Sequence, residues 1–231
     1  MSYDIVSFDL DGTLVDTAAE IAEAANRALQ SHGIARRPGE EIVGLIGQGA
    51  HQLMRSLLGR VFEEQPGLEA GLRVEAVLQS LDHHYALTAG TSASPYPGTR
   101  EALSRLRDDG VKLACVTNKE FRHAERVLAV TGLAHFFELT IGGDSLPFKK
   151  PDPGVLRHVV DALGGDLRRT AHVGDSSTDV RAARSAGVAA WAVPYGYNAG
   201  RPIAEAGPER IFGRLLDVAE HVIGLRLSGR A

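Results

Sequence analysis

Two aspartates, Asp9 and Asp11, follow the first apolar segment of the chain and are separated by one residue. Residues 5–8 are apolar and β-branched, which is typical of a buried parallel strand. Because side chains alternate along a strand, both carboxylates point to the same side where this strand ends. Like charges this close raise one of the two pKa values unless a cation lies between them, and oxygen ligands suit Mg²⁺. The pair, followed at once by Gly12, therefore predicts a magnesium site.

Thr117 and Asn118 directly follow a second apolar segment, residues 111–116. A hydroxyl and an amide between the end of a strand and the start of a helix offer hydrogen-bond donors for a phosphate. A plain helix N-cap explains the same two residue types. Further along the chain, Lys149 and Lys150 form a pair of cations before a proline-stiffened helix start, which fits a phosphate site or a basic surface turn.

A second pair of acids, Asp175 and Asp179, follows the apolar segment of residues 170–173. Gly174 permits a tight backbone there, Asp175 is placed to bind a metal ion, and Asp179 lies one helical turn further on. A helix capped by Asp175 or Ser176 is the alternative interpretation. Each of these polar groups is ambiguous by itself, and its function depends on whether the fold brings it to the others.

Short apolar segments alternate with helical segments after residue 98, and this pattern predicts the elements that position the polar groups. We expect strands at residues 111–116, 137–141, 170–173 and 188–193, and helices that begin near residues 99, 120, 153 and 177. The alternation predicts an α/β fold with a Rossmann-like parallel sheet, which includes residues 5–8, and helices on both of its faces. Ligands of such sheets bind at the carboxyl ends of the strands, where all four polar groups are expected to meet.

Residues 17–91 lack this alternation and read as helical throughout, so we expect an all-helical insert. Its expected features are a capping box at Thr17 and Glu20, a second helix through residues 51–58 and a third through residues 68–85. The chain is therefore expected to divide into a core, residues 1–16 and 92–231, and a helical cap, residues 17–91.

The composition is that of an ordinary globular protein: 231 residues, 44% of them hydrophobic, with a net charge of −4. Neither the charge nor the hydrophobicity indicates a nucleic-acid or membrane partner, and we expect neither. The single cysteine, Cys115, excludes an internal disulfide, and no targeting segment is evident, so we expect a cytoplasmic monomer or homodimer. Only four of the 25 basic residues are lysines, which gives each lysine a slightly higher chance of a specific role.

The string Asp9-Leu10-Asp11-Gly12-Thr13-Leu14 resembles the first motif of the haloacid dehalogenase-like phosphotransferases, and the three later polar groups match the other motifs of this family in order. The resemblance implies that Asp9 is a nucleophile that forms an aspartyl-phosphate and that Asp11 is the general acid and base. It also implies that Mg²⁺ is bound by Asp9, by the Asp11 carbonyl group and by Asp175.

The same resemblance assigns the phosphoryl group to Gly12, Thr117, Asn118 and Lys150, of which Thr117 and Lys150 are also catalytic. Asp179 is implied to support the site by orienting Lys150 or a water molecule. The helical insert is implied to be a lid that closes over the site and excludes water.

A closer resemblance concerns two loops. Residues 194–200 and 46–50 resemble the loop after the last core strand and the cap loop of bacterial phosphoglycolate phosphatases. This similarity implies a small phosphomonoester substrate, 2-phosphoglycolate. The candidate cap residues for reading the substrate are Gly47, Gln48, Gly49, His51 and Arg55.

Several other functions share parts of this pattern. Phosphatases of sugar phosphates, amino-sugar phosphates or nucleotides, and phosphosugar mutases, carry the same four motifs. A dehalogenase is disfavoured because it lacks the second carboxylate of the first pair. A signalling receiver domain also uses a phosphorylated aspartate but places it on a middle strand, and a silent scaffold is expected to have lost one of four charged residues: Asp9, Asp11, Lys150 and Asp175.

Overall fold

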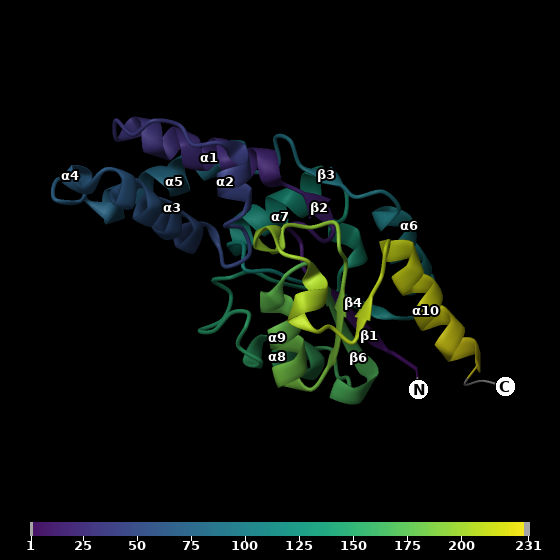
Figure 1. Ribbon diagram of the computed structural model, residues 1–231. Helices are drawn as coiled ribbons and strands as arrows, with labels where there is room; N and C mark the ends of the chain where they lie inside the picture. Colours follow the sequence, from purple (N-terminus) through teal and green to yellow (C-terminus); the bar gives the residue numbers. More distant parts are fainter. Residues whose placement is uncertain (1, 229–231) are drawn as a thin grey trace.

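A six-stranded parallel sheet forms the centre of the protein, as seen in a computed structural model that describes residues 2–228 (Figure 1). The strands, in their order across the sheet, are β5 (Leu139–Ile141), β4 (Lys112–Val116), β1 (Ile5–Phe8), β6 (Thr170–Gly174), β7 (Ala189–Ala192) and β8 (Arg210–Ile211). The first strand of the chain therefore lies between β4 and β6, with which it pairs in parallel. The expected α/β fold is confirmed.

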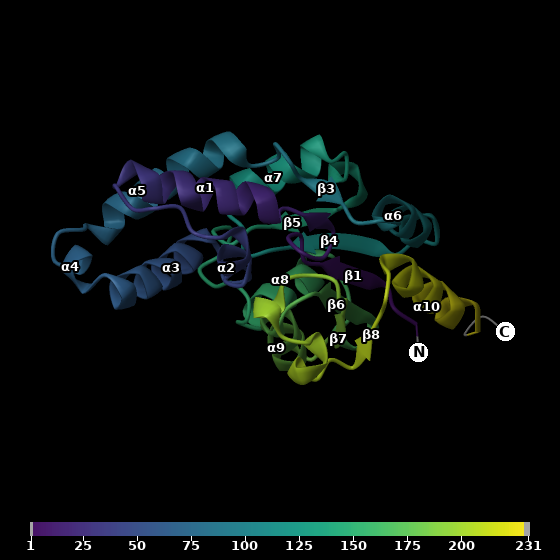
Figure 2. The same ribbon diagram turned by 45° about the horizontal axis from the view of Figure 1, so that its top comes forward.

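Helices cover both faces of this sheet (Figure 2). One face is covered by α6 (Thr99–Asp108), α7 (Phe121–Val130) and α10 (Leu215–Ser228), and the other by α8 (Gly154–Ala162) and α9 (Ser177–Ala186). Four short 3₁₀ helices complete the core, at Ala134–Phe136, Leu167–Arg169, Asn198–Gly200 and Ile203–Ala206. Each layer of helices buries its own apolar cluster against the sheet. This packing holds the loops that follow the strands in place.

The insert forms a helical layer with its own apolar cluster, beyond the carboxyl ends of the strands (Figure 1). Its helices are α1 (Ala18–Ser31), α2 (Gly39–Val43), α3 (Ala50–Glu64), α4 (Pro66–Glu69) and α5 (Val74–Thr88). A two-stranded antiparallel ribbon of β2 (Val15–Asp16) and β3 (Ser94–Pro95) lies where the chain leaves and re-enters the core. The division at residues 17–91 stays a prediction, and the separate cluster supports it.

Two details of the insert differ from the sequence-based expectation. Thr17 and Glu20 do not form a capping box, because the Thr17 hydroxyl donates to Asp11 Oδ1 (2.7 Å) and Glu20 Oε2 accepts from the Gly90 N–H (2.8 Å). The expected third helix is divided into α4 and α5, and Gly71, a poor helix former, lies in the turn between them.

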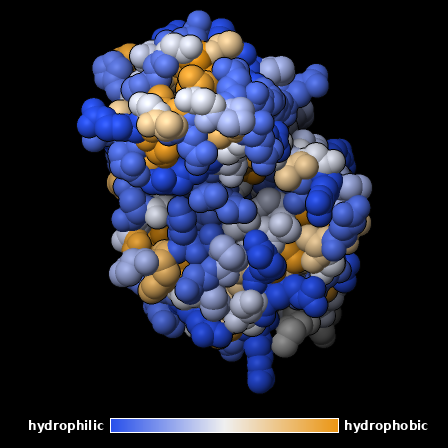
Figure 3. All heavy atoms as spheres, turned by 60° about the vertical axis from the view of Figure 1, so that its left-hand side comes forward, coloured by the Kyte–Doolittle hydropathy of each residue, from blue (hydrophilic) through white to orange (hydrophobic). Residues whose placement is uncertain are grey.

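The surface seen from the cap side is mostly hydrophilic, with hydrophobic groups scattered over it (Figure 3). Within residues 2–228, no helix combines the length and the apolar character that crossing a bilayer requires.

The apolar cluster of the cap gives a prediction about stability. Leu57 on α3 is fully buried, whereas Leu87 on α5 is 54% exposed. We expect Leu57→Ala to lower the free energy of unfolding by about 2–5 kcal/mol, because it removes buried methyl groups and leaves a cavity. Leu87→Ala is the matched control, with an expected change within about 0.5 kcal/mol. Urea unfolding measures both values, and equal losses in the two variants would contradict the packing described here.

Candidate active site

The polar groups singled out from the sequence meet at the carboxyl edge of the sheet. Asp9 follows β1, Thr117 follows β4 and Asp175 follows β6, and these three strands are adjacent. Lys150 comes from the loop before α8 and reaches into the same place, where its side chain is only 2% exposed. The expected meeting of the four groups at one edge is therefore observed.

Three buried carboxylates form the centre of this site. The ligand oxygens of Asp9, Asp175 and Asp179 lie within 4.8 Å of one another. Burial, only partly opposed by Lys150, raises the pKa of Asp9 to about 7, and burial followed by repulsion from Asp9 raises the pKa of Asp175. Because a divalent cation with oxygen ligands removes this penalty, the donor set fits such a metal ion.

Lys150 joins the nucleophile candidate to Asp179. Its Nζ lies 2.7 Å from Asp9 Oδ1 and 2.6 Å from Asp179 Oδ1. Burial opposes ionisation of Asp179, but Lys150 and His172 outweigh it and lower the pKa of that carboxyl. His172 Nε2 lies 3.2 Å from Asp179 Oδ1, so His172, which is buried in β6, helps to hold Asp179. Asp179 is thus placed to orient Lys150.

Asp175 is held in place by neutral donors. The Thr13 hydroxyl donates to Asp175 Oδ1 (3.2 Å) and the Tyr197 N–H donates to Oδ2 (2.6 Å). Gly12 has a φ of +85°, and a Cβ atom there would lie 2.4 Å from Asp175 Oδ2. The Gly12 N–H donates to the Val15 carbonyl (2.9 Å), so the role of Gly12 in phosphate binding stays a prediction, and its visible role is to admit Asp175.

Thr117 and Asn118 directly follow β4, at the expected phosphate site. The two residues offer different donor groups there. The Thr117 hydroxyl accepts from the Lys119 N–H (3.2 Å) and keeps its own proton for a ligand. The Asn118 side-chain amide donates to the carbonyls of Gly47 (3.2 Å) and Lys150 (2.8 Å), so its two N–H bonds are already used. Any donor from Asn118 to a phosphate is therefore its backbone N–H.

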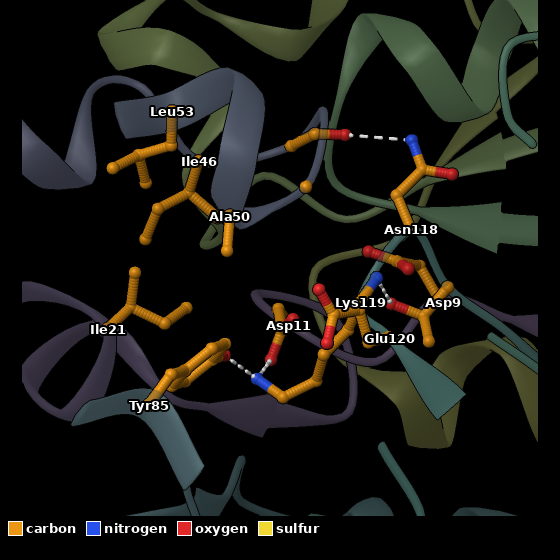
Figure 4. A pocket seen from close by; sticks show the side chains of 13 residues that line it. Asp9, Asp11, Ile21, Ile46, Ala50, Leu53, Tyr85, Asn118, Lys119 and Glu120 are labelled. Atoms are coloured by element: carbon orange, nitrogen blue, oxygen red, sulfur yellow. Dashed lines mark hydrogen bonds and ion pairs between the residues drawn. The ribbon is translucent and has the colours of Figure 1, made fainter. Parts of the chain in front are cut away.

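Lys119 belongs to the site but did not emerge from the sequence. Its Nζ lies 2.9 Å from Asp11 Oδ1, and it also contacts the Tyr85 hydroxyl (Figure 4). Both contacts join it to residues distant in the chain, so no local motif marks it. The rarity of lysine was the one available sequence signal, and of the lysines near the site Lys119 and Lys150 are buried whereas Lys149 is exposed.

A small pocket between cap and core contains Asp9 and Asp11 (Figure 4). The cap contributes an apolar lining and one phenol to it: Ile21, Ile46, Ala50, Leu53 and Tyr85. The pocket is thus enclosed on the cap side by these residues and on the core side by Asp9, Asp11 and Lys119.

The candidate cap residues divide into two groups. Gly47 and Gly49 line the pocket, as expected for residues that read a substrate. The others are not among its lining residues: Gln48 gives its carbonyl to Lys149 Nζ (3.3 Å), His51 Nε2 lies 2.7 Å from Asp82, and Arg55 pairs with Glu75 (3.1 Å). His51 and Arg55 contact carboxylates, but these belong to α5 of the cap.

A parallel sheet with an inserted helical cap and this set of charged residues defines the class of protein. The chain belongs to the haloacid dehalogenase-like hydrolases, since the model of that family matches residues 3–187. It is 42% identical over 192 residues to a plasmid phosphoglycolate phosphatase of Cupriavidus necator, covering 83% of this chain and 81% of that protein. It is 37% identical over 215 residues to the phosphoglycolate phosphatase of Nitrosospira multiformis, with 93% of both chains covered.

The protein is also similar to a solved structure of this kind. A crystal structure of a predicted phosphoglycolate phosphatase from Haemophilus somnus superimposes with a TM-score of 0.90 at 30% identity, covering 96% of this chain and 98% of that one. The chain is therefore an enzyme of the phosphatase type. The receiver-domain and scaffold alternatives have no support in these relatives.

Gly12 gives a prediction about the site. Gly12→Ala places a Cβ atom against Asp175, so we expect kcat/KM for phosphate release to fall by about 100-fold through displacement of that carboxylate. Gly33→Ala is the matched control, because Gly33 has a similar φ of +72° and no atom within 4 Å of its Cβ position. If both variants lose activity equally, the contact with Asp175 is not the cause.

His123 gives a prediction about pH. Burial, followed by Arg122, lowers the pKa of His123 to about 4, from an unfolded value of about 6.5. The folded protein then binds fewer protons than the unfolded chain, so this group weakens the fold as the pH falls below 6.5 towards 4.

Between pH 7 and pH 5 the free energy of unfolding should therefore fall by up to about 2 kcal/mol more in the wild type than in His123→Gln. Urea unfolding at the two pH values measures the difference. Equal pH dependence in the two proteins would show that His123 does not cause it.

Proposed function

We propose that this protein is a magnesium-dependent phosphatase of small phosphomonoesters and that its substrate is 2-phosphoglycolate. The observation that carries the proposal is the pocket between cap and core in which Asp9 and Asp11 lie together, with Lys150 on Asp9. The cap lining of this pocket gives a leaving group an enclosed place beside Asp11. The names of the two relatives described above support the same substrate.

In the proposed reaction, Asp9 attacks phosphorus and the bond from phosphorus to the leaving oxygen breaks, which gives an aspartyl-phosphate. Lys150 contacts Oδ1 of Asp9, which orients the carboxylate and presents Oδ2 for the attack. Asp9, Asp175 and the Asp11 carbonyl would hold Mg²⁺, which would supply positive charge to the phosphoryl group. The Thr117 hydroxyl and the Asn118 N–H hold phosphoryl oxygens.

Asp11 is the general acid and general base of the proposed reaction. Both of its contacts, from the Thr17 hydroxyl (2.7 Å) and from Lys119 Nζ (2.9 Å), are made to Oδ1. Oδ2 is therefore the oxygen that gives a proton to the departing alkoxide and later takes one from the attacking water. Since an alkoxide leaves poorly without a proton, Asp11 is expected to matter most for alkyl esters such as 2-phosphoglycolate.

The proposal predicts the outcome of an activity panel. Phosphate release is measured with Mg²⁺ on 2-phosphoglycolate, sugar phosphates, amino-sugar phosphates and nucleotides. We expect a preference for 2-phosphoglycolate, loss of activity with EDTA, and a fall in kcat of at least about 10⁴-fold in Asp9→Asn, which lacks the nucleophile.

Asp161→Asn is the matched control for that variant, because Asp161 is exposed on α8 and lies outside the site. Activity spread evenly over the panel would keep the phosphatase mechanism and reject the substrate. Full activity of Asp9→Asn would reject the mechanism.

A further inference from the structure

A second buried ammonium group lies on the cap side of Asp11. Lys119 Nζ is 2.9 Å from Asp11 Oδ1, contacts the Tyr85 hydroxyl and lies 4.0 Å from Glu20 Oε1. Its side chain is 1% exposed. Burial disfavours the charged form, but Asp11 and Tyr85 outweigh this and raise the pKa of Lys119, so the group stays an ammonium.

The phosphoryl side of the site does not require this charge. Lys150 already neutralises that side, between Asp9 and Asp179. Of the described residues that line the pocket, Lys119 is the one cation, and apart from Tyr85 and the nearby Glu20 the cap residues beside it are apolar. Two of its three N–H bonds have acceptors, in Asp11 and Tyr85, and the third has Glu20 Oε1 at 4.0 Å, which is beyond hydrogen-bond distance, so it can turn to a ligand.

The position of Lys119 relative to Asp11 matches the shape of the leaving group. A general acid approaches the leaving oxygen to about 3 Å. A cation hydrogen-bonded to the other oxygen of the same carboxyl group is then within about 8 Å of that leaving oxygen. In 2-phosphoglycolate a single CH₂ group separates the leaving oxygen from the carboxylate, so a substrate carboxylate turned towards the cap approaches Lys119.

We propose that Lys119 and Tyr85 form the subsite for the carboxylate of the substrate. The inference rests on the proposed function, because it takes the leaving group to be a carboxylated alcohol. Lys119 forms the ion pair, and the Tyr85 hydroxyl, which accepts from Lys119, donates its own proton to the same carboxylate. Burial raises the pKa of Tyr85, which keeps that proton in place.

The two residues come from different parts of the fold. Lys119 follows β4 of the core, whereas Tyr85 lies on α5 of the cap, and Figure 4 shows their side chains meeting beside Asp11. The subsite is complete only where the cap contacts the core. A substrate carboxylate would therefore bind both parts at once, in a pocket whose apolar lining strengthens the ion pair.

The test compares two esters that differ in the carboxylate. We measure kcat/KM for 2-phosphoglycolate and for ethyl phosphate, and take the ratio as the discrimination. Any effect of Lys119 that acts only through Asp11 changes both values and cancels in the ratio. We expect Lys119→Met to lower the discrimination by about 100-fold, mainly through KM, and Tyr85→Phe to lower it by about 5- to 10-fold.

Two further variants make the comparison specific. Lys119→Arg, which restores a cation, is expected to recover part of the discrimination lost in Lys119→Met. Lys149→Met is the matched control, since Lys149 is exposed and contacts only the Gln48 carbonyl (3.3 Å), and its discrimination should equal that of the wild type. If Lys119→Met fails to fold, competitive inhibition of the wild type by glycolate, compared with ethylene glycol, measures the same preference for the carboxylate.

The outcomes separate this inference from the proposed function. Hydrolysis of 2-phosphoglycolate with unchanged discrimination in Lys119→Met, or inhibition by glycolate no stronger than that by ethylene glycol, would overturn the subsite alone. If the wild type ignores 2-phosphoglycolate but prefers other carboxylated esters such as phosphoserine, and loses that preference in Lys119→Met, the substrate is wrong and the subsite stands. A wild type that prefers ethyl phosphate to every carboxylated ester would overturn both.

Discussion

Three carboxylates buried at one edge of the sheet, those of Asp9, Asp175 and Asp179, impose the main constraint on this structure. Uncompensated charges in such a place destabilise a fold by several kcal/mol each, so positive charge has to be supplied at fixed positions. Lys150 provides one such charge between Asp9 and Asp179, and the raised pKa values of Asp9 and Asp175 identify the part of the cluster that a divalent cation would neutralise. It is the positive charge that these acids require, from Lys150 and a divalent cation, that suits the site to a doubly charged phosphate.

The backbone around these acids is shaped by the same crowding. A Cβ atom at Gly196 would lie 2.2 Å from Asp175, so the loop after β7 reaches the acid only because it has no side chain there. Tyr197, the next residue, donates its N–H to Asp175, and its hydroxyl donates to Asp16 (2.8 Å) at the entrance to the cap. One loop thus connects the metal-ligand candidate with the segment that carries the cap.

The core of the site could be predicted from the sequence because its signals are local. Asp9, Thr117 and Asp175 each stand just after an apolar segment, and parallel strands bring their carboxyl ends to one edge. Lys119 could not be predicted in this way, since its partners Tyr85 and Asp11 lie 34 and 108 residues away. The capping box expected at Thr17 and Glu20 is not formed, although its local sequence signal is present. Both side chains hydrogen-bond instead to groups outside the helix terminus. The Asn118 amide was likewise expected to face a ligand but links the cap loop to the Lys150 loop.

The distribution of the two buried lysines suggests how chemistry and selectivity are separated. The Lys150 ammonium is hydrogen-bonded to two carboxylates of the core, Asp9 and Asp179. Lys119 contacts Asp11 of the core and Tyr85 of the cap, so its environment is complete only when the two parts meet. In the proposed site Lys150 interacts with the phosphoryl group, which every phosphomonoester has. Lys119 can distinguish one substrate from another only through the leaving group. In the proposed reaction Lys119 and the leaving oxygen have one neighbour in common, Asp11, so that recognition of the leaving group and its protonation would depend on the same carboxylate.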